Sequence, residues 1–170
     1  MPDKSIYSEK IEENAEIKGI TNFLMNSDNF YPSYDSNVTY FKNGELFFED
    51  FMAQLEKAKK FIFIEFFIID LDESWEKIVS VLERKVADGV EVRVLYDAIG
   101  SVTASSKFYV DYLKSKGIDA QIFLPLFPVF STQQNNRDHR KIVIIDGHVG
   151  YTGGVNISNE YFNMEKRRFN

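Results

Sequence analysis

The residues best suited to chemistry lie in the last third of the chain. His139 and Lys141 stand two positions apart in the basic run Arg137–Lys141, and Asp146 follows. In an extended segment, side chains two residues apart project from the same face, so the imidazole and the ammonium group would share one pocket. The cation could then hold a phosphate oxygen while the imidazole attacks phosphorus.

A glycine pair follows this run. Gly153 and Gly154 lack a Cβ atom, which lets their backbone N–H groups approach a ligand closely. We expect a helix to begin near Asn156, because its N-terminal amides would favour an anion and the Asn156 side chain would add a donor. Fixed donors of this kind suit transfer at phosphorus, where charge spreads over the non-bridging oxygens.

The elements that must position these groups alternate between strands and helices. Apolar runs predict strands at residues 38–41, 61–69, 90–96, 118–124, 140–145 and 149–152. Helical spacing of apolar residues predicts helices at residues 5–26, 47–60, 74–88 and 105–116. Asn43-Gly44 and Asp146-Gly147 predict turns, the second a tight hairpin. The order indicates an α/β fold with a mostly parallel or mixed sheet and helices on both faces, in which ligands bind beyond the carboxyl ends of the strands.

Three carboxylates can take part in the site or only support the fold. Glu65 interrupts the most apolar run, and a buried carboxylate needs a partner, so either an ion pair with Lys141 or an arginine shapes the site, or a purely structural pair forms. Asp97 ends a strand, where both sites and turns are common, and we favour the turn. Asp146 begins the Asp-Gly turn, five positions after Lys141, which points it away from the phosphate and favours a structural role.

Composition limits the remaining possibilities. The 170 residues contain no cysteine, which excludes disulfides, thiolate zinc sites and a cysteine nucleophile. A net charge of −6 argues against wrapping of nucleic acid, although basic residues outnumber acidic ones over residues 105–150 and favour a local anion site there. No apolar stretch is long enough to cross a bilayer, so we expect this chain itself to be soluble.

Six positions at fixed spacing carry a resemblance to a known family. The pattern His139-x-Lys141-x4-Asp146-x6-Gly153-Gly154-x-Asn156 resembles the signature of the phospholipase D superfamily. Residues 136–147 and 151–157 more narrowly resemble bacterial cardiolipin synthases, as do residues 38–41, 63–69 and 89–97, so that the resemblance covers roughly residues 30–165. The spacing of apolar residues predicts an N-terminal helical segment over residues 1–30. The resemblance implies a phospholipase D-like half-domain, the first of two repeats and truncated at its C-terminus, over residues 31–170.

The resemblance implies a phosphodiester exchange in two steps, without a metal or another cofactor. His139 attacks phosphorus to form a phosphohistidine, a second histidine from a second copy of the motif protonates the leaving alcohol, and an incoming alcohol reverses the process. Lys141 and Asn156 hold phosphate oxygens, beside Gly153 and Gly154. In cardiolipin synthases the donor and the acceptor are both phosphatidylglycerol, which gives cardiolipin and glycerol.

The chain departs from the family's pattern because it carries the motif once. His148, its other histidine, has no lysine two positions later, and the sequence ends at Asn170, before a Trp-Arg-Asp-like strand whose carboxylate orients a motif histidine in this family. We therefore expect the N-terminal half of an enzyme of the bacterial cytoplasmic membrane, without its transmembrane helices and with little turnover of its own. Its expected partners are phosphatidylglycerol, an anionic membrane surface and the missing second half, but no nucleic acid.

Two other functions stay open. A single-motif phosphodiesterase or nuclease could complete its site as a homodimer, although the acidic net charge disfavours a nuclease. A non-catalytic lipid-binding module could keep the motif for folding. The apolar, uncharged loop over residues 122–130 suits a lipid-facing surface and an ordinary buried crossover equally well.

Overall fold

The computed structural model describes residues 15–28, 36–125 and 136–165. The chain forms two compact units, Met1–Tyr40 and Phe41–Asn170. In the first unit the described helix is α2 (Ala15–Asp28), which takes up the C-terminal part of the helix expected at residues 5–26. In none of the described ranges is a helix both long and apolar enough to cross a membrane.

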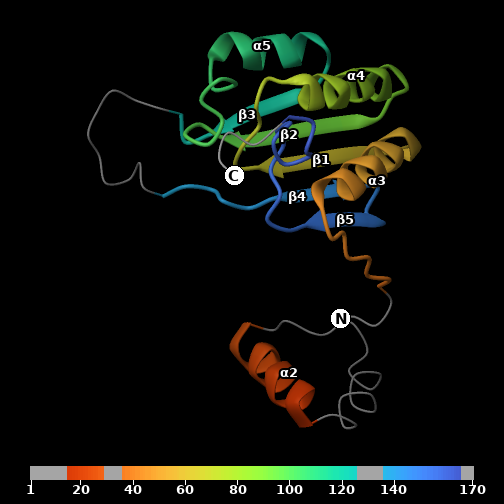
Figure 1. Ribbon diagram of the computed structural model, residues 1–170, viewed down its shortest axis with the longest axis vertical. Coiled ribbons are helices and arrows are strands. Elements are labelled where there is room, and N and C mark those ends of the chain that lie inside the picture. The colour runs from red at the N-terminus through yellow and green to blue at the C-terminus, as the bar shows by residue number, and fades with distance from the viewer. Residues whose placement is uncertain (1–14, 29–35, 126–135, 166–170) are drawn as a thin grey trace. The chain divides into compact units, whose positions relative to one another are not determined.

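The second unit is built on a mixed five-stranded sheet (Figure 1). Its strands are β1 (Phe61–Phe66), β2 (Glu91–Asp97), β3 (Asp119–Phe123), β4 (Ile142–Ile145) and β5 (Val149–Thr152). They lie in the order β3-β2-β1-β4-β5. The first three are parallel, whereas β4 runs antiparallel to β1, and β5 runs antiparallel to β4. The carboxyl ends of β1, β2 and β3 and the beginning of β4 therefore meet at one edge of the sheet.

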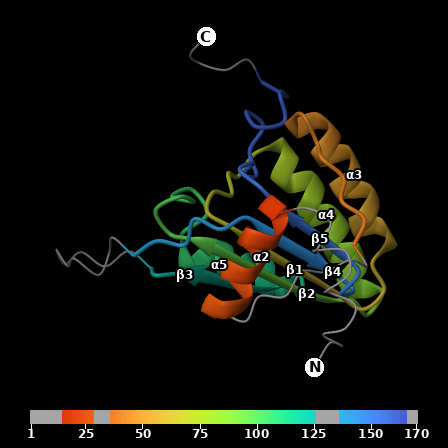
Figure 2. The ribbon, with the colours of Figure 1, turned by 90° about the horizontal axis from the view of Figure 1, so that it is seen from below.

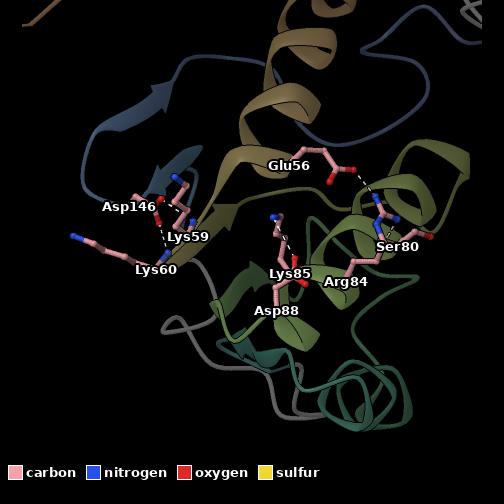
Figure 3. A network of polar contacts seen from close by, with 8 residues as sticks. All are labelled: Glu56, Lys59, Lys60, Ser80, Arg84, Lys85, Asp88 and Asp146. Atoms are coloured by element: carbon pink, nitrogen blue, oxygen red, sulfur yellow. Dashed lines mark hydrogen bonds and ion pairs between the residues drawn. The ribbon is translucent and has the colours of Figure 1, made fainter.

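Three helices of this unit each start after a polar cap. They are α3 (Gly44–Lys57), α4 (Glu73–Ala87) and α5 (Lys107–Ser115). The caps Asn43, Asp72 and Ser106 each accept a backbone N–H of the first turn through their side chains, at 3.1 to 3.2 Å. Figure 2 shows α3 and α4 side by side along the sheet. An exposed ion pair, Glu56–Arg84, joins these two helices (Figure 3).

The core lies between the helices and one face of the sheet. Side chains of β1 and β2 alternate, and Ile62, Ile64 and Val94 on the inner face are almost fully buried. On the opposite face, Arg93 and Ile144 are exposed. The predicted α/β fold with a mixed sheet is confirmed, and the described helices of this unit cover one of the two faces on which we expected helices.

The predicted Asp146-Gly147 hairpin is confirmed. Both residues have positive φ angles, 56° for Asp146 and 73° for Gly147. A two-residue turn of this kind matches the twist of the strands that it joins, and here it connects β4 to β5.

Two predictions for the start of the second unit and the chain before it are wrong. Residues 36–41 form no strand, and Val38 and Tyr40 are almost fully exposed. Four residues, three of them apolar, do not hold an extended segment without a partner strand. Asn43-Gly44 is no turn, because Asn43 caps α3 and Gly44 is its first residue. A Cβ atom at Gly44 would collide with the carbonyl oxygen of Tyr161, which explains the glycine.

The helix expected near Asn156 does not form either. Ile157 instead makes a parallel bridge with Ile69, and residues 159–163 are turns. The Oδ1 atom of Asn156 accepts the backbone N–H of Ile68 at 3.1 Å. This bond holds residues 156–157 against residues 68–69, which follow β1. A side chain that binds a neighbouring backbone in this way competes with helix formation.

Candidate functional site

The candidate site lies at the edge of the sheet where β1 and β2 end and β4 begins. Figure 1 shows residues 136–141 reaching β4 from this side. The segment belongs to no strand. Phe67, which directly follows β1, lies against it.

The His139 imidazole faces solvent. Its ring centroid lies 4.7 Å from that of Phe67, with an angle of 54° between the two planes. The ring has no hydrogen bond or ion pair with the residues that the structure describes, and the side chain is exposed. An exposed nitrogen without a competing partner is available to a reacting group.

Lys141 is buried beside the same aromatic ring. The residue is 5% exposed, and its Nζ atom lies 5.3 Å from the Phe67 ring centroid. Nζ donates a hydrogen bond of 2.7 Å to the backbone oxygen of His139. Burial lowers the pKa of the Lys141 ammonium group, and the charge of Asp138 offsets part of this effect. The cation is therefore bonded to the backbone of the histidine, and Phe67 contacts both side chains.

Asp97 joins the end of β2 to the histidine segment. Its Oδ1 atom accepts the backbone N–H of Ile99 at 2.8 Å, which forms the expected turn. Its Oδ2 atom accepts the backbone N–H of Asp138 at 3.1 Å, and Arg137 lies 3.4 Å from its Oδ1 atom. Because Asp97 is completely buried, these bonds fix the backbone immediately before His139.

Arg140 pairs with two carboxylates. Its Nε and Nη2 atoms donate to the two oxygens of Asp138 at 2.9 and 2.8 Å, a bidentate arrangement. Glu65 Oε1 lies 2.8 Å from the same Nε atom, so the partner of Glu65 is Arg140 and not Lys141. Burial and then the neighbouring Asp138 raise the pKa of Glu65, whereas the bond to Arg140 lowers the pKa of Asp138 against the effect of burial. Glu65 is therefore the first of the two carboxylates to take up a proton.

The glycine pair is not required by the fold. A Cβ atom added at Gly153 or Gly154 would meet nothing within 4 Å, and neither residue has a positive φ. Both are exposed and directly follow Thr152, which pairs with Ile142 across the hairpin. This register brings the pair near the beginning of β4, with open space above its backbone.

Asn156 is largely committed to the fold. The residue is 3% exposed, and besides its bond to Ile68 its Nδ2 atom donates to the hydroxyl of Tyr161 at 2.9 Å. The amide has a second hydrogen on Nδ2, but the helix N-terminus that would have supported an anion here is missing. Its contact with a phosphate therefore stays a prediction.

Asp146 lies at the opposite end of β4 from the histidine, and Figure 3 shows it beside Lys59 and Lys60. Its carboxylate accepts three backbone N–H groups, from Lys59 at 2.8 Å, Lys60 at 2.7 Å and Phe61 at 2.9 Å. Burial raises the pKa of Asp146, but the three donors together bring it below its usual range. The aspartate thus fastens the hairpin to the beginning of β1.

Replacing Asp146 is expected to reduce stability without touching the histidine. We expect Asp146→Ala to lower the free energy of unfolding by about 2 kcal/mol, since three N–H groups lose a charged acceptor. Because the folded pKa is depressed, this stabilisation is present above the ordinary pKa of 3.8 and is lost as the pH falls below it. Urea unfolding from pH 7 to pH 2 measures both effects.

The control is Asp146→Asn, which keeps an acceptor oxygen and tolerates the positive φ. Its stability should respond less to acid than that of the native chain. Equal acid dependence of the two proteins would show that this carboxylate does not contribute the pH-dependent stability.

Several residues of the site carried no recognisable signal in the sequence. Phe67 belongs to a long apolar run and cannot be distinguished there from the core, although it contacts both motif side chains. Arg140 stands in a variable position of the motif, Asp138 precedes the motif, and the third member of their cluster, Glu65, comes from a distant segment. The expected apolar loop over residues 122–130 lies mostly outside the described residues.

A separate pocket of about 350 Å³ lies between α4 and α5. Its lining includes Trp75, Tyr109 and Lys116, and the last of these is paired with Glu83 at 2.6 Å. Burial is the main effect that raises the pKa of Tyr109, to about 12, so its hydroxyl keeps its proton at neutral pH. No lining residue belongs to the candidate site. Within the described ranges, no cluster of three acidic or histidine side chains is arranged to hold a metal ion.

Comparison with known proteins gives a family match. Residues 51–167 match the family model described as "Cardiolipin synthase, PLD-like domain". The chain is 42% identical over 165 residues to an uncharacterized protein of Streptococcus mutans, covering 97% of this chain and 36% of that protein. It is 38% identical over 144 residues to a cardiolipin synthase of Listeria monocytogenes, covering 85% of this chain and 30% of the relative. The chain thus spans about a third of the length of these relatives.

Two solved structures are also similar to this chain. Nuc from Salmonella typhimurium, a phospholipase D family member, has a TM-score of 0.46 at 22% identity, over 65% of this chain and 64% of that one. NucT from Helicobacter pylori has a TM-score of 0.48 at 18% identity, over 67% and 69% of the two chains.

Proposed function

This chain belongs to the family of cardiolipin synthase phospholipase D-like domains, and on that premise we propose that it supplies the attacking histidine of a phosphatidyltransferase that joins two phosphatidylglycerol molecules. One observation carries the proposal. The exposed His139 imidazole and the buried Lys141 cation contact the same aromatic ring at the edge of the sheet where ligands bind.

The proposed reaction has two displacements at phosphorus. A ring nitrogen of His139 forms a bond to the phosphorus of one phosphatidylglycerol, and the bond from phosphorus to the headgroup glycerol breaks. The leaving glycerol takes a proton from an acid outside this chain. A hydroxyl of a second phosphatidylglycerol then attacks the phosphohistidine and gives its proton to the same group. The phosphorus–nitrogen bond breaks, which yields cardiolipin and restores His139.

The side chains around the histidine have distinct proposed roles. Lys141 places a positive charge next to His139, where it would stabilise the non-bridging oxygens of the reacting phosphate in the transition state. The backbone at Gly153 and Gly154 can approach the same oxygens because no side chain is needed there for folding. Asp97 and the Glu65–Arg140–Asp138 cluster hold the segment rigidly and act as positioning residues.

The second imidazole has to come from another copy of the motif. The curated relatives are about three times as long as the matched region, which supports the proposal that Phe41–Asn170 corresponds to the first repeat of a two-repeat enzyme. We accordingly propose that the acid is a histidine of the second repeat, and that the complete enzyme works at the bacterial cytoplasmic membrane. The isolated chain should then show little turnover.

The test compares this chain with the complete protein that carries it. Each is incubated with phosphatidylglycerol vesicles, and cardiolipin and glycerol are measured. The complete protein should release one glycerol for each cardiolipin formed, and the 170-residue chain should form almost none. Cleavage of nucleic acid by a dimer of this chain would favour the phosphodiesterase instead. Binding of phosphatidylglycerol by the complete protein without any turnover would favour a lipid-binding module.

A further inference from the structure

The loop between β2 and α5 exposes apolar side chains next to the candidate site. Val102 is 65% exposed, Ile99 is 44% exposed, and Phe108, at the start of α5, is 87% exposed. Side chains of this size normally turn inward, and three of them lie within ten residues. We call Ile99, Val102 and Phe108 the apolar patch.

A rigid base holds this loop. Ser101 is fully buried, and its Oγ atom accepts the backbone N–H of Ile69 at 2.9 Å and donates to the carbonyl oxygen of Phe67 at 3.1 Å. The carbonyl oxygen of Ala104, also fully buried, accepts the hydroxyl of Tyr96 at 2.7 Å. The small residues of the loop are therefore anchored in the core, while its large apolar residues point outward.

The same contacts connect the loop to the edge of the sheet that carries His139, which we call the catalytic edge. Phe67, which binds Ser101 through its backbone, packs its ring against His139. Asp97 accepts N–H groups from Ile99 on one side and Asp138 on the other. Figure 1 shows the loop leaving the sheet at the edge where residues 136–141 arrive. The patch and the imidazole thus have a fixed separation.

Local charge suits an anionic surface. Over residues 98–110 the one charged side chain is Lys107, although the whole chain carries a net charge of −6. Residues 136–141 contain three basic residues and one acidic residue. The loop itself therefore has no acidic side chain that an anionic bilayer would repel, and Lys107 offers a cation to lipid headgroups.

We propose that the apolar patch inserts into the interfacial region of an anionic bilayer and so presents His139 to the lipid headgroups. The proposal rests on the proposed function for its choice of a lipid surface as partner. Apolar side chains flanked by basic residues bind such surfaces by burying apolar area at the boundary between headgroups and acyl chains. Docking would bring the substrate phosphate to the histidine without extracting the lipid from the membrane.

A tryptophan placed in the patch tests this directly. The chain has one tryptophan, Trp75, which is fully buried and should not be quenched by brominated lipids. In Val102→Trp, vesicles of brominated phosphatidylglycerol should quench the new fluorescence and shift it to shorter wavelengths. Ile144→Trp is the matched control, because Ile144 is 40% exposed on the open face of the sheet. It should not be quenched.

A loss-of-binding variant completes the test. Val102→Ser combined with Phe108→Ser should weaken sedimentation with phosphatidylglycerol vesicles by about tenfold. The circular dichroism of this variant should be unchanged, because both side chains are exposed. Absence of quenching in a folded Val102→Trp chain, or equal quenching at Ile144, would overturn the proposal and indicate a protein partner or another docking face.

Docking and catalysis can fail separately. His139→Ala should keep native vesicle binding, because the imidazole is not part of the patch. If the complete protein makes no cardiolipin but brominated lipids still quench the tryptophan at position 102, the proposed phosphatidyltransferase activity is wrong and the proposed membrane docking is supported. If cardiolipin forms and the patch is not quenched, the docking proposal is wrong.

Discussion

In the complete protein, His139→Ala should abolish the formation of cardiolipin, with kcat reduced by more than about 10³-fold. The imidazole is the attacking group in the proposed reaction, and its exposed ring has no hydrogen bond with the described residues that the change would break. Stability should therefore stay close to that of the native protein. Incubation with phosphatidylglycerol that is radiolabelled in the phosphate, followed by alkaline quenching, measures the phosphohistidine directly.

His148 provides the matched control for this change. It is the chain's other histidine, and it is exposed beside the Asp146-Gly147 turn at the far end of β4. His148→Ala should retain native activity and native phosphoenzyme. If radiolabel were still covalently bound to residues 1–170 in the His139→Ala variant, His139 would not be the attacking group. Loss of activity in both variants would indicate a general effect on folding.

Local signals predicted the elements of the second unit well. The alternation of apolar residues placed β1, β2, β3, β4 and β5 within a few residues of their observed bounds. Gly89 and Gly117, which follow α4 and α5, adopt positive φ angles of 87° and 77°, a conformation typical of glycines at the ends of helices. Such features depend on a few consecutive residues, so one sequence is enough to find them.

The polar contacts of the site could not be predicted in the same way. Glu65 was expected to meet Lys141 or an arginine, and only the register of β1 against β4 brings it to Arg140. Asn156 was expected to begin a helix, but its amide binds Ile68 from a segment far away in the chain. These outcomes depend on which segments become neighbours in the sheet, and residue spacing within one segment carries no such information.

Lys141→Met in the complete protein should lower kcat/KM by about 10² to 10³-fold, equivalent to about 3 to 4 kcal/mol of transition-state stabilisation. Methionine fills a similar volume but removes the positive charge next to His139. The loss should fall mainly on kcat, because charge spreads over the non-bridging oxygens more in the transition state than in the bound lipid. Rates of cardiolipin formation at varied surface concentrations of phosphatidylglycerol measure it.

Stability should separate this role from a structural one. Lys141 is 5% exposed, and within the described residues its ammonium group has one hydrogen-bond acceptor, the backbone oxygen of His139. A buried cation with so little compensation disfavours the folded state, which is why burial lowers its pKa. Lys141→Met should therefore unfold at the same or a higher urea concentration than the native protein while activity falls. If stability and activity fell together, Lys141 would have a structural role in residues 136–141. A lysine whose role is to stabilise charge on the bound substrate is not expected to stabilise the protein without substrate.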